Sequence, residues 1–195
     1  MVKYANVIKE ITFPLDEGVK FKLDGKKLEV NGPKGKVTRD FTHARNLSIE
    51  LSGKDKVILE VKFPRKKDLS IIGTVEGHIK NMILGVTKGF KYVMKIVYAH
   101  FPITVKVDKN NNNVEIQNFI GERGFRVVPI MGDVKISATK EDVIIEGVDK
   151  ELIGQNAANI QLKTKIADKD LRIFQDGIYV YEKWAGDDRY WQVKT

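Results

Sequence analysis

The fold is decided by two related segments, Lys54-Asp55-Lys56-Val57-Ile58-Leu59-Glu60-Val61 and Lys140-Glu141-Asp142-Val143-Ile144-Ile145-Glu146-Gly147. Both begin with charged residues and continue with a run of β-branched and aliphatic residues, a pattern typical of a buried strand. The two segments lie 86 residues apart. A repeat at this distance predicts two copies of one unit, because each copy is long enough to close its own small core.

Upstream of each segment, apolar residues alternate with polar residues along two successive runs. Such alternation predicts half-buried strands, and two neighbouring runs predict a hairpin. The apolar positions are Val19, Phe21, Leu23, Leu28 and Val30 in the first copy and Ile103, Val105, Val107, Val114 and Ile116 in the second.

A helix is predicted to follow the strands in each copy. In the first copy, apolar residues recur at helical spacing between about Asp68 and Lys88, and Gly89 is suited to the C′ position. In the second copy, Asp149 is a plausible N-cap for a helix that turns Ile153, Ala157 and Ile160 inward. The inward positions of the first helix are Ile72, Val75, Ile79, Met82, Ile83 and Val86.

The order of elements predicts an α+β protein with two tandem duplicated domains. Each domain is expected to be an antiparallel sheet covered on one face by one helix. Residues 89–97 alternate as a strand does and are assigned to the end of the first domain. The predicted domains are therefore residues 1–97 and residues 98–195, the second including a C-terminal tail that carries both tryptophans.

The formal net charge of +8 favours a polyanionic partner, because clustered Lys and Arg displace counterions from phosphates. The basic residues are unevenly distributed. Residues 1–98 contain 20 Lys and Arg against 11 Asp and Glu, whereas residues 99–195 contain 14 against 15. Net charge alone thus points to the N-terminal half.

Catalysis, cofactors and metal binding are not indicated. The absence of cysteine excludes thiolate chemistry and disulfides. His43, His78 and His100 show no paired spacing, and packing is the expected role of the last two. The sequence has no apolar run long enough for a membrane span and no N-terminal signal peptide, so we expect a cytoplasmic protein without membrane contact.

Three basic segments are candidates for phosphate contacts. Lys34 lies in the turn 31–36, which lacks the context of a nucleotide-binding loop and also fits a plain hairpin turn. Arg65-Lys66-Lys67 precedes the first helix and could equally be solvated surface. The segment 121–126 supplies Arg123, Gly124, Phe125 and Arg126, a mixture of guanidinium groups, glycine and aromatic ring that suits RNA.

Short motifs along nearly the whole chain resemble those of one family. Gly32-Pro33-Lys34-Gly35 and His78-Ile79-Lys80-Asn81 to Phe90 resemble N-domain signatures of the large-subunit ribosomal protein L-six family, called L-nine in eukaryotes. Tyr98-Ala99-His100-Phe101-Pro102-Ile103, Glu115 to Arg123 and Asp176 to Val180 resemble its C-domain signatures in the archaeal and eukaryotic branch. One departure is Arg126-Val127, where the family usually has two adjacent basic residues.

The resemblance implies a structural constituent of the large ribosomal subunit. Its expected partners are the large-subunit rRNA near the sarcin-ricin region, neighbouring ribosomal proteins and nearby translation factors. The alternative is a free-standing RNA-binding or ribosome assembly factor with the same fold. The candidate rRNA-binding residues are Arg123, Gly124, Phe125, Arg126, Lys163, Lys165, Lys169, Arg172, Tyr179 and Lys183 in the second half, with Lys34, Arg65, Lys66 and Lys67 in the first.

Net charge and resemblance therefore favour different halves of the chain. Binding depends on local potential rather than on the sum over a whole surface, so we place the main anchor in the second half. This requires the loop 121–126 and the chain end to come together. It also requires the acidic residues Glu141, Asp142, Glu146 and Glu151 to lie away from the loop.

Overall fold

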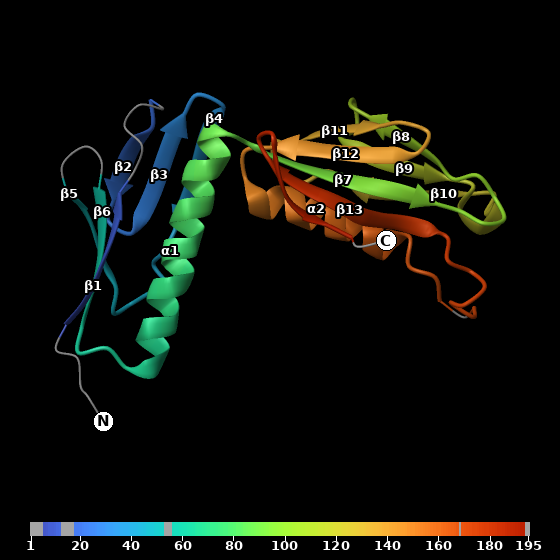
Figure 1. Cartoon of the computed structure of the whole chain (residues 1–195). Helices are drawn as coiled ribbons and strands as arrows, with labels where there is room; N and C mark the ends of the chain where they lie inside the picture. The colour runs from blue at the N-terminus through green and yellow to red at the C-terminus, as the bar shows by residue number, and fades with distance from the viewer. Residues whose placement is uncertain (1–5, 13–17, 53–55, 168, 194–195) are drawn as a thin grey trace. The chain divides into compact units, whose positions relative to one another are not determined.

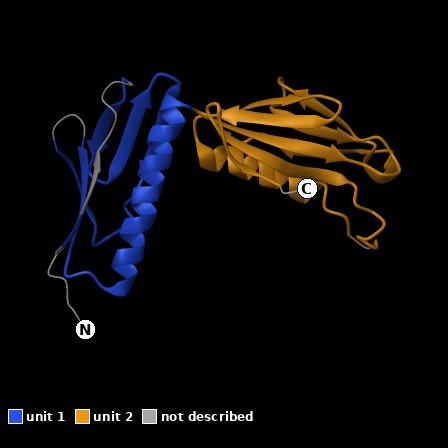
Figure 2. Cartoon of the chain, viewed as in Figure 1, with its two compact units in different colours: residues 1–88 blue, residues 89–195 orange. Residues whose placement is uncertain are grey.

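The computed structural model describes residues 6–12, 18–52, 56–167 and 169–193 (Figure 1). The chain divides into two compact units, unit 1 with residues 1–88 and unit 2 with residues 89–195 (Figure 2). This division precedes the expected boundary at 97/98. The reason is that β7, Phe90–Val97, pairs with two strands of unit 2 instead of closing the sheet of the first unit.

Unit 1 contains two antiparallel sheets. One sheet has the order β1-β6-β5, and the other has the order β2-β3-β4. The strands are followed by the helix α1, Lys66–Thr87. Their bounds are β1 Asn6–Thr12, β2 Lys20–Asp24, β3 Lys27–Gly32, β4 Gly35–Asp40, β5 Ser48–Ser52 and β6 Lys56–Lys62.

Unit 2 repeats this plan and extends it. One sheet has the order β11-β12-β7-β13-β14, and the other has the order β10-β9-β8. The helix α2, Lys150–Lys163, follows β12, and a short 3-10 helix, η2, spans Phe119–Gly121. The strands are β8 Thr104–Asp108, β9 Asn113–Gln117, β10 Phe125–Pro129, β11 Lys135–Ala138, β12 Asp142–Gly147, β13 Gly177–Ala185 and β14 Asp188–Gln192.

The two units have the same strand order, as the sequence repeat predicts. The path β1-β6-β5 corresponds to β7-β12-β11, and the meander β2-β3-β4 corresponds to β8-β9-β10. The repeated segments form β6 and β12, although Lys54 and Asp55 lie outside the described residues. The α+β class and the duplication are thus confirmed, but the strands of each unit form two sheets rather than one.

The cores follow the predicted periodicities. The predicted inward residues Leu28, Val30, Val114 and Ile116 of the hairpins are buried on β3 and β9. α1 buries Ile72, Val75, Ile79, Met82 and Val86, whereas the predicted inward residue Ile83 is only half-buried. The inward residues predicted for α2, Ile153, Ala157 and Ile160, are also buried. Each fully buried aliphatic side chain contributes about 1.5–3 kcal/mol relative to exposure, so these faces hold each helix on its sheets.

Local contacts set the helix ends. α1 begins two residues before the predicted start, because the Asp68 carboxylate accepts a hydrogen bond from the Arg65 backbone N–H at 2.8 Å. Gly89 has φ +74°, as expected of a C′ residue. At α2, the Asp149 carboxylate accepts from the Glu151 N–H at 2.9 Å. Neither of these helices has the length and apolar composition needed to cross a bilayer, and the described residues include no other candidate span.

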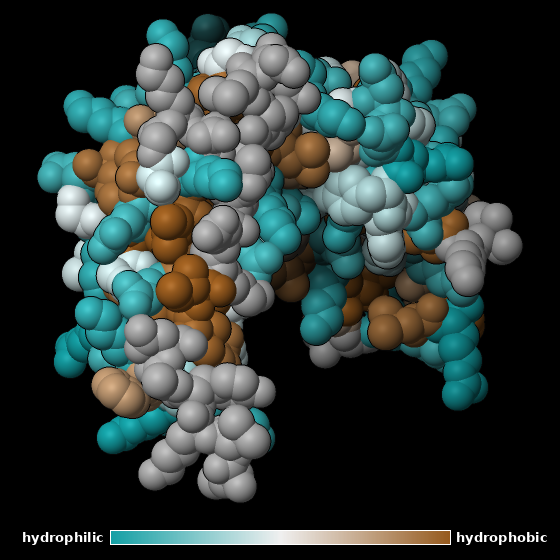
Figure 3. Space-filling view, turned by 60° about the vertical axis from the view of Figure 1, so that its left-hand side comes forward, coloured by the Kyte–Doolittle hydropathy of each residue, from teal (hydrophilic) through white to brown (hydrophobic). Residues whose placement is uncertain are grey.

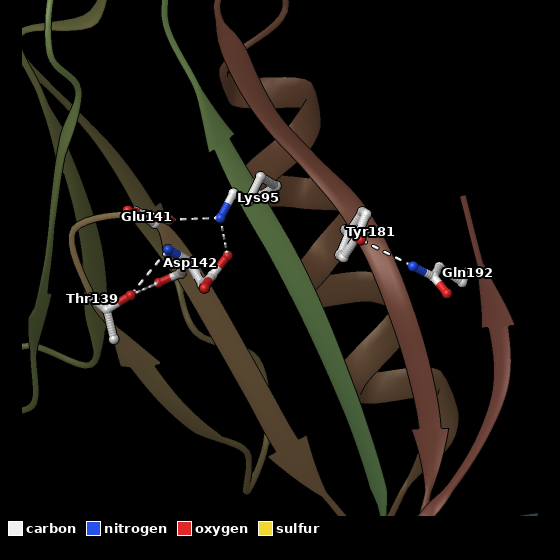
Figure 4. Close-up of polar contacts among 6 residues, drawn as sticks. All are labelled: Lys95, Thr139, Glu141, Asp142, Tyr181 and Gln192. Atoms are coloured by element: carbon white, nitrogen blue, oxygen red, sulfur yellow. Dashed lines mark hydrogen bonds and ion pairs between the residues drawn. The ribbon is translucent and has the colours of Figure 1, made fainter. Parts of the chain in front are cut away.

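The C-terminal tail extends the five-stranded sheet of unit 2. Trp184 lies on β13 and Trp191 on β14, with a register shift in their pairing after Lys183. The Tyr181 hydroxyl accepts a hydrogen bond from the Gln192 side-chain amide at 2.9 Å, which joins the two strands (Figure 4). Both tryptophans of the chain therefore report on unit 2.

Candidate nucleic-acid interface

Three segments of unit 2 that are distant in the sequence meet at one end of its sheets. They are residues 98–102, 118–126 and 163–179, residue 168 excepted, and we call them the loop surface. The Asn118 side-chain amide donates to the Pro102 carbonyl at 3.1 Å. The Ala99 N–H donates to Asp176 at 2.9 Å. The Arg126 guanidinium donates to the Lys163 carbonyl at 2.6 Å, so the loop 121–126 meets the end of α2. The predicted site required the loop to meet the chain end that carries Lys183, and Lys183 lies elsewhere on unit 2.

The loop surface exposes aromatic and aliphatic side chains beside basic ones. Phe125 is 59% exposed and Leu171 is 63% exposed. Figure 3 shows the molecule turned so that the unit 1 side of Figure 1 comes forward, and on this face too apolar side chains lie in patches between hydrophilic ones. Mixed surfaces of this kind suit RNA, because bases stack on exposed rings while cations neutralise phosphates. The exposed basic side chains of the loop surface are Arg123, Lys163, Lys165, Lys169 and Arg172.

Arg126 is engaged inside the loop surface. Its guanidinium donates to both carboxylate oxygens of Glu122, at 2.9 and 2.5 Å, and to the Lys163 carbonyl at 2.6 Å. It also lies 4.2 Å from the centroid of the buried Phe119 ring. Arg126 therefore joins the loop to the end of α2, whereas Arg123 and Gly124 are exposed to solvent.

Several acidic residues of unit 2 are paired with basic side chains. Arg126 lowers the pKa of the Glu122 carboxyl through its hydrogen bonds. Glu141 and Asp142 both pair with Lys95, at 2.9 and 3.2 Å (Figure 4). Asp142 is the first residue of β12 and opposes Lys95 near the end of β7, and Glu141 directly precedes it. The single Lys95 ammonium offsets one of their two negative charges. The expectation that the acidic residues lie away from the loop 121–126 stays a prediction.

The remaining candidates of unit 2 fall into two groups. Lys169 lies over the Phe174 ring at 4.8 Å, and the Tyr179 hydroxyl donates to the Gln175 carbonyl at 3.3 Å, both on the loop surface. Lys183 is not brought there. Its ammonium lies over Tyr92 and Trp191, at 5.2 and 4.7 Å, on the sheet face that also carries the core residues of β7.

The candidates of unit 1 lie at opposite ends of α1. The Lys34 backbone N–H and ammonium donate to the carbonyls of Val86 and Lys88, so Lys34 satisfies the helix C-terminus. Arg65, Lys66 and Lys67 are exposed where α1 begins. A helix of 22 residues is roughly 33 Å long, so these residues do not form one site with Lys34.

His100, Phe174 and Asp176 were not among the predicted site residues. The His100 ring stacks on Phe174 with centroids 4.9 Å apart, and its Nδ1 lies 3.7 Å from the buried Asp176 carboxylate. No local pattern signals this pairing, because the residues are far apart in the sequence. Within the described ranges, no group of three or more His, Asp or Glu side chains is placed to hold a metal ion.

Comparison with known proteins identifies the family. A model of the family described as ribosomal protein L6 matches residues 16–89 and 101–177. The chain belongs to the ribosomal protein L6 family. The large ribosomal subunit protein uL6 of Staphylothermus marinus is 47% identical over 189 residues, which is 96% of this chain and 100% of that protein. The uL6 proteins of Desulfurococcus amylolyticus and Methanobrevibacter smithii are 45% and 46% identical, each over 94% of this chain and at least 98% of their own length.

Membership of the L6 family confirms the resemblance to its archaeal and eukaryotic branch, and the relatives named above are archaeal. The two matched segments fall in the two units, so each unit is one copy of the L6 repeat. L6 proteins are structural ribosomal proteins and not enzymes, which confirms the expectation that the chain carries no catalytic site.

Proposed function

We propose that the chain is a structural component of the large ribosomal subunit and binds large-subunit rRNA through the loop surface of unit 2. The observation that carries this proposal is the meeting of three segments into one exposed surface of rings and cations, with Glu122 paired and Asp176 buried. The family resemblance points to the sarcin-ricin region of the rRNA and to translation factors nearby. Neighbouring ribosomal proteins are further partners, and the cytoplasmic ribosome is the proposed location.

The geometry divides the candidate residues by role. Arg123, Lys163, Lys165, Lys169 and Arg172 are the proposed phosphate contacts, and Phe125 and Tyr179 are the proposed stacking rings. Arg126 positions the loop and makes no phosphate contact of its own. Arg65, Lys66 and Lys67 remain proposed secondary contacts of unit 1. The ammonium of Lys34, by contrast, donates to a carbonyl at the end of α1.

Salt-dependent binding tests the proposal. Full-length protein is titrated against an rRNA fragment that contains the sarcin-ricin loop, at 50 to 200 mM salt. About six phosphate contacts are expected to lower the affinity roughly a thousandfold over this range. Arg123→Ala combined with Lys165→Ala is expected to reduce the salt slope by about 1.5, and the matched double variant Lys66→Ala with Lys67→Ala by less. A larger decrease in the salt slope for Lys66→Ala with Lys67→Ala would place the main anchor in unit 1, the half that has the higher net positive charge.

The alternative, a free-standing RNA-binding or assembly factor, differs in stoichiometry. A structural component sediments with mature large subunits at one copy for each particle. A factor is found with precursor particles or free in the extract. Quantifying the protein across a sucrose gradient separates the two functions.

A further inference from the structure

The Asp176 carboxylate is buried without enough hydrogen-bond donors. Only 1% of the residue is exposed. Its Oδ1 accepts from the Ala99 N–H at 2.9 Å, but its Oδ2 has no hydrogen-bond partner. A buried carboxylate that lacks a compensating donor or cation is strongly destabilising. Asp176 is therefore stabilised by a hydrogen-bond donor or a positive group beside Oδ2.

His100 is the side chain placed to supply that positive group. Its Nδ1 lies 3.7 Å from Oδ2, within the range of an ion pair. Its ring stacks on Phe174 at an interplanar angle of 27°. Two contacts therefore fix the imidazole, while 42% of its side chain is exposed. Because Nδ1 faces the carboxylate, Nε2 on the opposite edge of the ring is directed away from Asp176.

The surroundings of His100 favour an anion. Lys169 places its ammonium 4.8 Å from the centroid of the same Phe174 ring on which His100 stacks. The Tyr179 hydroxyl donates to the backbone carbonyls of Gln175 and Asp176, so it is held in place. A Cβ at Gly177 would lie 2.7 Å from the outer end of the Tyr179 ring, so a side chain there would displace that ring. The segment that carries Asp176 is thus built tightly against an exposed ring.

We propose that His100 is a phosphate contact of the loop surface and that Asp176 is its positioning residue. The imidazolium donates Nδ1–H toward Asp176 and Nε2–H to a phosphate oxygen of the RNA backbone, and Lys169 neutralises the same phosphate region. An imidazolium has two N–H donors, and a charge-assisted bond to phosphate is about twice as strong as a neutral one. This inference rests on the proposed function, since it names a contact within the proposed RNA-binding surface.

Binding measurements with His100 variants test the contact. His100→Phe keeps a ring on Phe174 but removes both donors, and His100→Gln keeps a neutral donor. Binding of the sarcin-ricin-containing fragment is expected to weaken about tenfold in His100→Phe and less in His100→Gln. In both variants the slope of log affinity against log salt concentration is expected to decrease in magnitude by about 0.7 to 0.9, the contribution of one phosphate contact. Wild-type affinity and slope in a folded His100→Phe protein would overturn the proposal.

The role of Asp176 is tested by a double-mutant cycle. Asp176→Asn keeps an acceptor for the Ala99 N–H and removes the charge that holds the imidazolium. In His100→Phe the buried Asp176 carboxylate has no partner, and Asp176→Asn removes that charge. If His100→Phe does not fold, the double variant His100→Phe with Asp176→Asn is therefore compared with Asp176→Asn alone. We expect His100→Phe to add little to the loss of affinity in Asp176→Asn. Fully additive losses would mean that the two residues act independently, contrary to the proposal.

The imidazole signal gives a direct readout. The chain has three histidines, so the His100 ring resonances can be assigned by comparison with His100→Phe. The RNA fragment is expected to shift them, and inorganic phosphate at equal ionic strength is expected to leave them unchanged. A shift with inorganic phosphate alone would make this a small-anion site and overturn the RNA contact. If wild-type protein does not bind the fragment, the proposed function fails. If wild-type protein binds the fragment and the His100 variants bind it equally well, only this inference fails.

Discussion

Replacing Arg126 with alanine is expected to destabilise unit 2 without removing a phosphate contact. The guanidinium makes a bidentate ion pair with Glu122, donates to the Lys163 carbonyl and covers the Phe119 ring. The Arg126 and Glu122 side chains are 26% and 43% exposed, so the ion pair contributes at most about 1 kcal/mol. The carbonyl bond and the ring contact each add about 0.5–1 kcal/mol. The expected loss is about 2 kcal/mol.

Tryptophan fluorescence during urea denaturation measures this loss. Since Trp184 and Trp191 both lie in the β13–β14 hairpin, the signal follows unit 2 and not unit 1. The control is Arg123→Ala, which removes an exposed arginine of the same loop and is expected to change stability by less than about 0.5 kcal/mol. RNA binding is expected to show the opposite pattern, with a lower salt slope in Arg123→Ala and an unchanged slope in Arg126→Ala.

The destabilisation should also depend on pH. The pKa of the Glu122 carboxyl is lowered in the folded state by Arg126, from an ordinary value of 4.5. A lowered pKa stabilises the fold above that ordinary value, and the contribution is lost as the pH falls through the lowered value. The difference between wild type and Arg126→Ala is therefore expected to shrink in acid. An unchanged denaturation midpoint in Arg126→Ala, together with a reduced salt slope, would refute the assignment and make Arg126 a phosphate contact.

Three further substitutions test the packing. Asn156→Ala is expected to destabilise unit 2 by about 2–4 kcal/mol in the same fluorescence assay, because the Asn156 side chain satisfies both the N–H and the carbonyl of Met131. Gly32→Ala is expected to lower the melting temperature of unit 1, since its Cβ would lie 2.7 Å from Val86. Gly77→Ala places a Cβ in open space on α1 and is expected to stabilise unit 1 by up to about 1 kcal/mol, measured by thermal unfolding with circular dichroism. A loss of stability would show that another part of the protein contacts the helix at Gly77.

The sequence by itself determined the class of fold and the faces of its elements. The alternation of Leu28 and Val30, and of Val114 and Ile116, with polar residues specifies which side of β3 and of β9 is apolar. The spacing of Ile72, Val75 and Ile79 specifies the inner face of α1. These are local properties, because a strand has a period of two residues and a helix a period of 3.6. The repeat then required the two halves to adopt the same strand order.

The tertiary structure alone decided which partners the elements and side chains take. The strand 90–97 was correctly placed, but its assignment to unit 2 depends on pairing with β12 and β13, which no local pattern encodes. Arg126 and Arg123 look alike in the sequence, yet only Arg126 reaches the end of α2. Asp176 meets Ala99 across 77 positions, so the site around His100 exists only in the folded chain. The physical reason is that long-range contacts are fixed by the packing of the whole unit, whereas periodicity records only the burial of each residue.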